Sequence, residues 1–140
     1  MAIQRTATAL WQGSGKEGGG QLTTQSGVLC DTPYSYPTRF EDKPGTNPEE
    51  LIGAAHAGCF SMKLAFVLNA GGFIAESIET NATVMLENGQ IPAIRLSTKI
   101  KCQGLTPQQL HDFATNAKEN CPVSKLLNAE IILEVELLDA

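Results

Sequence analysis

Basic side chains are in short supply in this sequence. Its 140 residues include 10 Lys and Arg against 15 Asp and Glu, which gives a formal net charge of −5. Proteins that bind DNA or RNA need a basic face to neutralise phosphates. The composition therefore argues against a nucleic-acid partner.

Long apolar runs are also lacking. The longest uninterrupted one, Leu64 to Leu68, is far too short to span a bilayer. The first residues, Met1 to Arg5, lack the apolar stretch of a secretory signal. We therefore expect a cytoplasmic protein with no membrane partner.

The cysteines lack the close spacing that metal sites usually show. Cys30, Cys59, Cys102 and Cys121 form no C-x-x-C pair, and His56-x-x-Cys59 has no second pair to match it. In a cytoplasmic chain they are also not interpreted as a structural disulfide framework. We expect no metal and no bound cofactor. A thiolate–histidine metal site built from His56, Cys59 and Cys121 is the alternative that metal analysis would decide.

Length and composition fit one domain, residues 1–140, with 42% hydrophobic and 18% charged residues. Residues 3–12 and 20–25 have the pattern of short strands around a glycine-rich turn. Residues 30–45 contain three prolines and no steady periodicity, which predicts an ordered loop.

A helix is predicted after this loop. Asn47 is a good N-cap, Pro48 suits the first helical position, and Gly71-Gly72 ends the helix. Residues 51–68 are apolar on nearly every side, and such a helix is normally buried all round. One small subunit can hardly cover it, so we expect a homodimer.

The remaining residues alternate between strand and helix patterns. Residues 78–87 and 94–102 show period-two alternation around Asn88-Gly89, which predicts a hairpin with one wet face. A capping box at Thr106 opens a helix to about Asn120, a short helix follows Cys121-Pro122, and residues 131–137 form a closing strand. The predicted order is ββ-α-ββ-αα-β.

Two cysteines stand out by position. Cys121 precedes Pro122 at a helix start, where the helix dipole favours thiolate; a buried cap residue is the alternative. Cys59 lies mid-helix among small residues that leave room for a ligand or another backbone; a core cysteine is the alternative. His56, three residues earlier on the same face, could act as a base or hydrogen-bond within the core.

Other chemically active residues have simpler explanations. Cys102 is in phase with the apolar face of its strand and is interpreted as a small buried hydrophobe. Cys30, beside Asp31, is interpreted as incidental. Glu50 is explained by helix capping, and Arg39 could simply be solvated.

Four runs carry a resemblance to a known family: residues 38–40 (Thr-Arg-Phe), 45–51 (Gly-Thr-Asn-Pro-Glu-Glu-Leu), 54–61 (Ala-Ala-His-Ala-Gly-Cys-Phe-Ser) and 121–124 (Cys-Pro-Val-Ser). The chain resembles the osmotically inducible protein C and organic hydroperoxide resistance (OsmC/Ohr) family over its whole length. Arginine in the Thr-Arg-Phe run makes it more similar to the osmotically inducible branch.

The resemblance implies an α+β fold, an intertwined homodimer whose central helices are wrapped by antiparallel sheets from both subunits. It implies thiol-dependent reduction of hydroperoxides to alcohols, organic ones preferred over hydrogen peroxide, in defence against oxidative stress. By the same resemblance Cys59 is the peroxidatic cysteine, Cys121 resolves it as a disulfide, and Arg39 and Glu49 form the activating polar pair.

The implied partners are an organic hydroperoxide and an external dithiol, such as a lipoyl group, that restores both thiols by exchange. The resemblance gives His56, Cys30 and Cys102 no role. The alternative of another class is a non-catalytic module that holds an apolar ligand or a partner in the same cleft. Such a module has no reason to pair Cys59 with Cys121 when peroxide is added.

Overall fold

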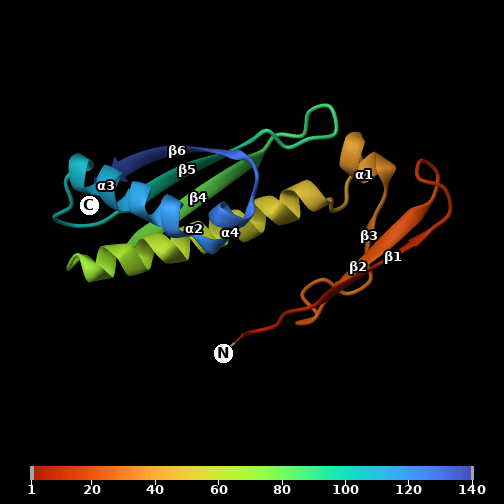
Figure 1. The fold of residues 1–140 in the computed structure, drawn as a ribbon, viewed down its shortest axis with the longest axis horizontal. Coiled ribbons are helices and arrows are strands. Elements are labelled where there is room, and N and C mark those ends of the chain that lie inside the picture. Colours follow the sequence, from red (N-terminus) through yellow and green to blue (C-terminus); the bar gives the residue numbers. More distant parts are fainter. Residues whose placement is uncertain (1, 140) are drawn as a thin grey trace. The chain divides into compact units, whose positions relative to one another are not determined.

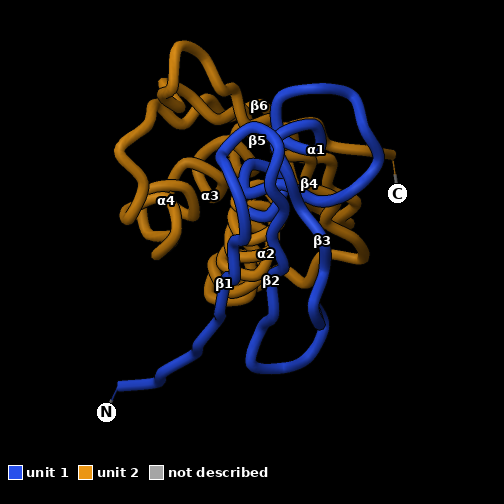
Figure 2. Tube along the Cα trace, turned by 90° about the vertical axis from the view of Figure 1, so that its right-hand side faces the viewer, with its two compact units in different colours: residues 1–51 blue, residues 52–140 orange. Residues whose placement is uncertain are grey.

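The structure is a computed structural model that describes residues 2–139, and it has the predicted α+β architecture (Figure 1). The chain divides into two compact units, residues 1–51 and residues 52–140 (Figure 2). Each unit has its own three-stranded sheet. That both units form a single domain stays a prediction.

The first unit contains an antiparallel sheet in the order β1-β2-β3, formed by β1 (Ala7–Gln12), β2 (Gly19–Thr24) and β3 (Thr32–Tyr34). Gly20 lies beneath the rings of Trp11 and Tyr34, where a side chain would collide with both. The two predicted strands are thus confirmed, although the first begins at Ala7 rather than at residue 3.

The prediction of a loop over residues 30–45 was wrong. This stretch contains β3 and a short helix, α1 (Tyr36–Phe40). Pro33 is tolerated because β3 is an edge strand that pairs only with β2. Pro37 falls in the first turn of α1, where its missing N–H costs no helical hydrogen bond. The same prolines that suggested a loop are therefore compatible with both elements.

The long helix α2 (Pro48–Ala70) is unbroken over 23 residues. The Asn47 side chain accepts a hydrogen bond of 2.7 Å from the Glu50 N–H, which confirms the predicted N-cap. Gly72 adopts a φ of 89° at the other end, as a helix-ending glycine does. The length and hydropathy of α2 would suffice to cross a membrane. The short apolar run at residues 64–68 did not indicate this. Core helices of soluble proteins have the same length and hydropathy.

The second unit is built on β4 (Ser77–Val84), β5 (Ala93–Lys101) and β6 (Glu130–Leu138), in that order across the sheet. β4 and β5 pair antiparallel, with Asn88 and Gly89 at positive φ near the hairpin tip, as predicted. β6 pairs with β5 in parallel, after a crossover through α3 (Pro107–Asn120) and α4 (Pro122–Leu126).

The core of this unit lies between the sheet and its helices, which cover one face (Figure 1). α2 contributes Phe60, Leu64 and Leu68, each fully buried and worth about 1.5–3 kcal/mol. These residues follow one stripe of the helix. Met62 and Phe66, on other faces, remain 64% and 63% exposed in the single chain. The apolar composition of α2 therefore exceeds what one chain buries.

Candidate active site

The structure brings Cys59 and Cys121 into contact within the second unit. Their sulfur atoms lie 3.1 Å apart, although 62 positions separate them in the sequence. Both thiols are free, and a disulfide of about 2.05 Å would need them to approach by roughly 1 Å. Cys59 is half-buried in the middle of α2, whereas Cys121 is fully buried at the N-cap of α4.

The two thiols have unlike electrostatic environments. Burial raises the pKa of Cys59, and the neighbouring Cys121 raises it further, while the Val123 backbone and the Lys63 charge act in the opposite direction. Burial also works against ionisation of Cys121. There, the Ser124 backbone, Cys59, the Ser124 hydroxyl and the Val123 backbone together outweigh burial and lower the pKa.

His56 is buried in the second unit and contacts Ser124, three residues after Cys121. Its imidazole is fully buried, and its Nε2 lies 2.6 Å from the Ser124 hydroxyl oxygen. Burial lowers the pKa of His56, so the ring is neutral at neutral pH. Of the two alternatives from the sequence, the structure shows the hydrogen-bonded core histidine.

Arg39 and Glu49 form an ion pair within the first unit. The guanidinium donates from Nε to both carboxylate oxygens at 3.1 and 3.2 Å and from an Nη atom at 3.0 Å. The Arg39 side chain is 38% exposed and that of Glu49 is 12% exposed. α1 and the first turn of α2 hold the two residues in place, since the Asn47 amide donates to the Thr38 carbonyl between them. Arg39 is thus not simply solvated.

The two remaining cysteines are also free thiols. Cys102 is buried in the core, as predicted, and Cys30 is exposed. The Cys102 thiol points towards the Ile74 carbonyl. Within residues 2–139, no cluster of three His, Cys, Asp or Glu side chains could hold a metal ion.

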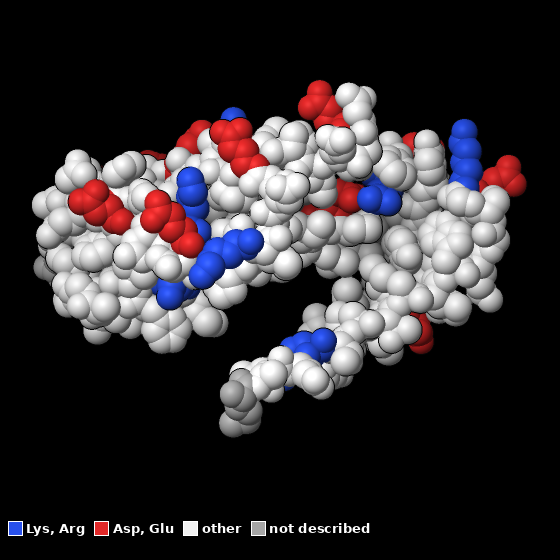
Figure 3. Space-filling view, in the orientation of Figure 1, with Lys and Arg blue, Asp and Glu red and all other residues white. Residues whose placement is uncertain are grey.

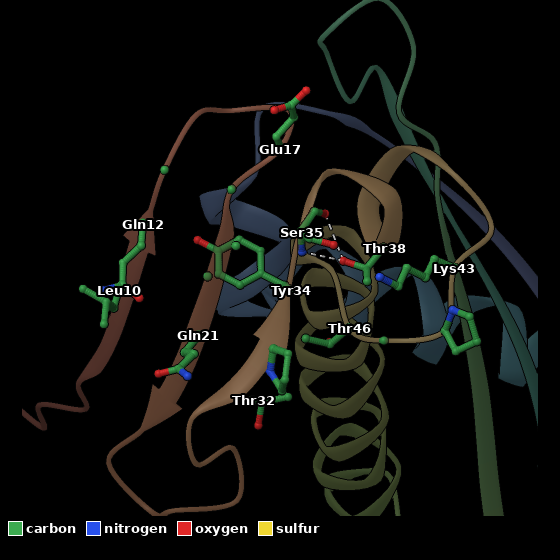
Figure 4. A pocket seen from close by; sticks show the side chains of 17 residues that line it. Leu10, Gln12, Glu17, Gln21, Thr32, Tyr34, Ser35, Thr38, Lys43 and Thr46 are labelled. Atoms are coloured by element: carbon green, nitrogen blue, oxygen red, sulfur yellow. Dashed lines mark hydrogen bonds between the residues drawn. The ribbon is translucent and has the colours of Figure 1, made fainter.

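A pocket of about 930 Å³ lies in the first unit, lined by residues that include Gln12, Glu17, Tyr34 and Lys43 (Figure 4). Thr38 lines it too, and its hydroxyl accepts from the Ser35 N–H at 2.8 Å. The pocket contains none of the four residues that the sequence singled out as the site. The volume of this pocket alone is no evidence for catalysis there.

Acidic and basic side chains share the molecular surface. On the face drawn in Figure 3, Lys and Arg side chains lie beside Asp and Glu side chains.

Comparison with known proteins places this geometry in a family. The model of the family described as OsmC-like protein matches residues 40–136. The Peroxiredoxin OsmC of Escherichia coli is 44% identical over 98% of this chain and 99% of its own length. This chain belongs to the OsmC-like family.

More distant relatives agree with this membership. The organic hydroperoxide resistance protein OhrB of Bacillus subtilis is 27% identical over 84% of this chain and 88% of its own length. An OsmC-like protein of unknown function from Vibrio cholerae has the same fold, with a TM-score of 0.77, 19% identity and coverage of 96% and 100% of the two chains. The predictions of an OsmC/Ohr protein and of a cysteine-based peroxidase that serves in oxidative stress defence are confirmed at this level.

Sequence reasoning missed two contributors to this OsmC-like site. Lys63 lies one helical turn after Cys59 and lowers its pKa, so i+4 spacing could have indicated it. Ser124 lies within the second signature run, but its partner His56 is 68 positions away. Local sequence patterns do not predict a contact between residues so far apart in the chain.

Proposed function

We propose that this protein reduces organic hydroperoxides to alcohols, and hydrogen peroxide less well, with Cys59 as peroxidatic and Cys121 as resolving cysteine. The observation that carries the proposal is the 3.1 Å contact between one half-buried and one fully buried thiol. A peroxide from solvent can reach Cys59. The burial of Cys121 and its contact with Cys59 support the resolving role.

The chemistry follows from that order. The Cys59 thiolate attacks the distal peroxide oxygen, the O–O bond breaks, and the alkoxide leaves as the alcohol after taking up a proton. Cys59 is then a sulfenic acid. The Cys121 sulfur attacks it, an S–S bond forms, the S–O bond breaks, and water leaves. An external dithiol, such as a lipoyl group, reduces the disulfide by exchange, and no bound cofactor takes part.

The first step needs Cys59 as a thiolate, which a nearby cation would stabilise. The residues around Cys59 in the single chain do not fully supply that cation. The pKa of Cys59 is raised in the single chain, although Lys63 favours the thiolate. The Arg39 guanidinium, held by Glu49, is suited to stabilise a thiolate and polarise a peroxide. We therefore assign Arg39 and Glu49 to the same site as Cys59.

Helix geometry supports the partner chain as the source of the pair. Glu49 and Cys59 are ten residues apart on α2, which has no break. At about 1.5 Å per residue they lie roughly 15 Å apart along the axis, beyond the reach of a glutamate side chain. The proposed site therefore combines Cys59 and Cys121 of one chain with Arg39 of the partner subunit and its Glu49, in an intertwined homodimer in the cytoplasm.

Two cysteine variants test the assignment. Cys59→Ser should abolish turnover with cumene hydroperoxide and dithiothreitol, because a hydroxyl is a far weaker nucleophile than a thiolate. Cys121→Ser should consume one equivalent of peroxide and then stall as a sulfenic acid that dimedone traps.

Cys30→Ser is the matched control, since Cys30 is exposed and outside the pair, and its turnover should equal that of the wild type. Wild-type turnover in Cys59→Ser would refute the peroxidatic role. If peroxide caused no loss of two thiols in the wild type, the protein would be a binding module instead.

A further inference from the structure

A small pocket in the first unit is lined mostly by aromatic rings and includes Arg39. Its volume is about 240 Å³, and its aromatic lining consists of Trp11, Tyr34, Tyr36 and Phe40. The whole chain has one Trp, two Tyr and five Phe, and this pocket takes the Trp, both Tyr and one Phe. The steps proposed above give these four rings no role.

The sheet of the first unit holds two of the rings together. Trp11 on β1, Gly20 on β2 and Tyr34 on β3 lie side by side in the register of the three strands. The rings of Trp11 and Tyr34 are 5.4 Å apart between centroids, with 60° between their planes. Gly20 permits this approach, since a Cβ there would lie 2.5 Å from the Tyr34 ring and 2.6 Å from the Trp11 ring.

The helix α1 supplies the other two rings and the cation. Tyr36 and Phe40 are one helical turn apart, and their ring centroids are 4.9 Å apart. The Arg39 guanidinium lies over the Phe40 ring, 5.0 Å from its centroid, while its N–H groups meet the Glu49 carboxylate. A ring thus holds the face of the guanidinium and a carboxylate holds its edge.

These rings do not form a closed core. Among residues 2–51, no hydrophobic side chain belongs to the buried core, which lies in the second unit. Phe40 is 51% exposed. Pockets for small ligands are mostly apolar and aromatic, with a few polar groups that fix the orientation of the ligand. Four rings and one held guanidinium match that description.

We propose that this aromatic pocket binds the organic group of the hydroperoxide, and that it selects compact groups, such as a phenyl ring, over long unbranched chains. The proposal rests on the function proposed above, in which Arg39 polarises the peroxide. The organic group of a hydroperoxide is bonded directly to the O–O group. A peroxide at Arg39 therefore has its organic group beside the rings that share the pocket with Arg39. Hydrogen peroxide has no such group and gains nothing from the rings.

The volume of the pocket limits the group that fits. At about 30 Å³ for each non-hydrogen atom, the share of liquid volume that a water molecule takes, the pocket of about 240 Å³ holds roughly eight atoms. A cumyl group is close to that size, whereas most of a long alkyl chain would stay in water. Each methylene that enters the pocket should strengthen binding about fourfold, and each one that remains outside should add little.

The first test needs no peroxide and uses alcohols of the kind that the reaction releases. Trp11 is the single tryptophan and is half-buried, so the tryptophan emission of the full-length protein reports on this pocket. Titration with 2-phenyl-2-propanol should shift the emission to shorter wavelength, because the alcohol displaces water from the indole. With unbranched primary alcohols, the affinity should rise about fourfold per methylene up to roughly eight carbons and then level off. An emission that no alcohol changes, or an affinity that rises well beyond that length, would overturn the proposal.

Variants of Tyr36 test the rings. Tyr36→Leu keeps an apolar side chain but removes a ring, and it should weaken the binding of 2-phenyl-2-propanol roughly five- to tenfold. Tyr36→Phe keeps the ring and should restore most of the affinity. Phe73→Leu is the matched control, since Phe73 pairs with Phe113 at 5.9 Å between centroids in the second unit, and it should bind like the wild type. Wild-type affinity in Tyr36→Leu would contradict the proposal.

Steady-state kinetics separate the pocket from the chemistry at Arg39. Tyr36→Leu should raise KM for cumene hydroperoxide and lower kcat/KM for it roughly five- to tenfold more than kcat/KM for hydrogen peroxide. Equal losses with both peroxides would show general damage to the site and overturn the selective role. A wild type inert to both peroxides would refute the proposed function, while the emission titration would still decide whether the pocket binds compact apolar groups.

Discussion

The ion pair between Arg39 and Glu49 holds a half-exposed guanidinium in a fixed geometry. An exposed pair is normally worth little, because water screens it and long side chains lose entropy. Here the planar guanidinium meets both carboxylate oxygens, and the 12% exposure of Glu49 limits screening. The pair therefore contributes little to the free energy of unfolding. Its value lies in a guanidinium that is held in one orientation.

Arg39→Lys should therefore lower the rate of the first, peroxide-consuming step by roughly tenfold or more, because the charge remains but the hydrogen-bonding fork is lost. Stopped-flow measurement of thiol loss against peroxide concentration gives that rate. Arg95→Lys is the matched control: Arg95 makes one 3.7 Å contact with Glu134, and both are about half exposed. An unchanged rate constant in Arg39→Lys would return Arg39 to a purely structural role.

His56 also gives the folded protein a pH dependence. Burial lowers its pKa below the ordinary value of 6.5 in the folded state. Below about pH 6.5 the unfolded chain takes up a proton that the folded chain does not, so the free energy of unfolding falls as the pH falls.

Urea unfolding between about pH 7 and pH 5 should show this loss, at up to about 1.4 kcal/mol per pH unit. His56→Gln should remove that contribution, because glutamine does not titrate, whereas the exposed His111→Gln should retain it. A wild type and a His56→Gln variant with parallel pH profiles would contradict the prediction.

At the scale of the helices and strands, the sequence predicted what is encoded locally. The cap at Asn47, the glycine stop at Gly72 and the alternation around Asn88-Gly89 each act within a few residues, and all three occur in the structure. β3 and α1 were missed because Pro33 and Pro37 fit an edge strand and a first helical turn as well as a loop.

Local sequence patterns do not predict which distant segments pair. The expectation of antiparallel sheets was wrong for β6, which pairs with β5 in parallel. The alternation of residues 131–137 is the same for a parallel and an antiparallel strand. In the site, the resemblance led to Cys59, Cys121, Arg39 and Glu49, and their catalytic roles stay predictions. The His56–Ser124 contact, over 68 positions, emerged only in the folded chain.

α2 carries a prediction of its own, because one chain covers only one of its faces. Met62 and Phe66 are mostly exposed, and Ala54, Ala55 and Gly58 leave a bare surface to which another backbone can pack closely. We expect these faces to be buried in the homodimer.

Phe66→Lys should therefore weaken the dimer, since a charge would replace a large apolar side chain on a face that we expect the partner to cover. Sedimentation velocity over a range of protein concentrations measures the effect. Ile74→Lys, at a residue that is 84% exposed just beyond α2, is the matched control and should leave the dimer intact. A wild type that sediments as a monomer would contradict the prediction directly.

At the scale of the whole molecule, a shared site would explain why the two clusters of functional residues fall in different units. Arg39 and Glu49 belong to residues 1–51, and the cysteine pair belongs to residues 52–140. α2 runs through the boundary between them without a break. An unbroken helix keeps Glu49 and Cys59 apart within one chain, so a site that contains both would need a second chain.

Complementation tests the shared site. Cys59→Ser and Glu49→Ala chains, each inactive alone, are mixed, unfolded and refolded so that subunits exchange at random. About half of the dimers are then mixed, and each mixed dimer has one site with both residues intact, so about a quarter of the sites should regain turnover. Cys59→Ser mixed with Cys121→Ser is the control. Those two sulfur atoms meet within one chain, so no mixed dimer restores the pair and no recovery is expected. If heterodimers form and Cys59→Ser with Glu49→Ala also recovers nothing, Glu49 acts only at the start of its helix and the site lies within a single chain.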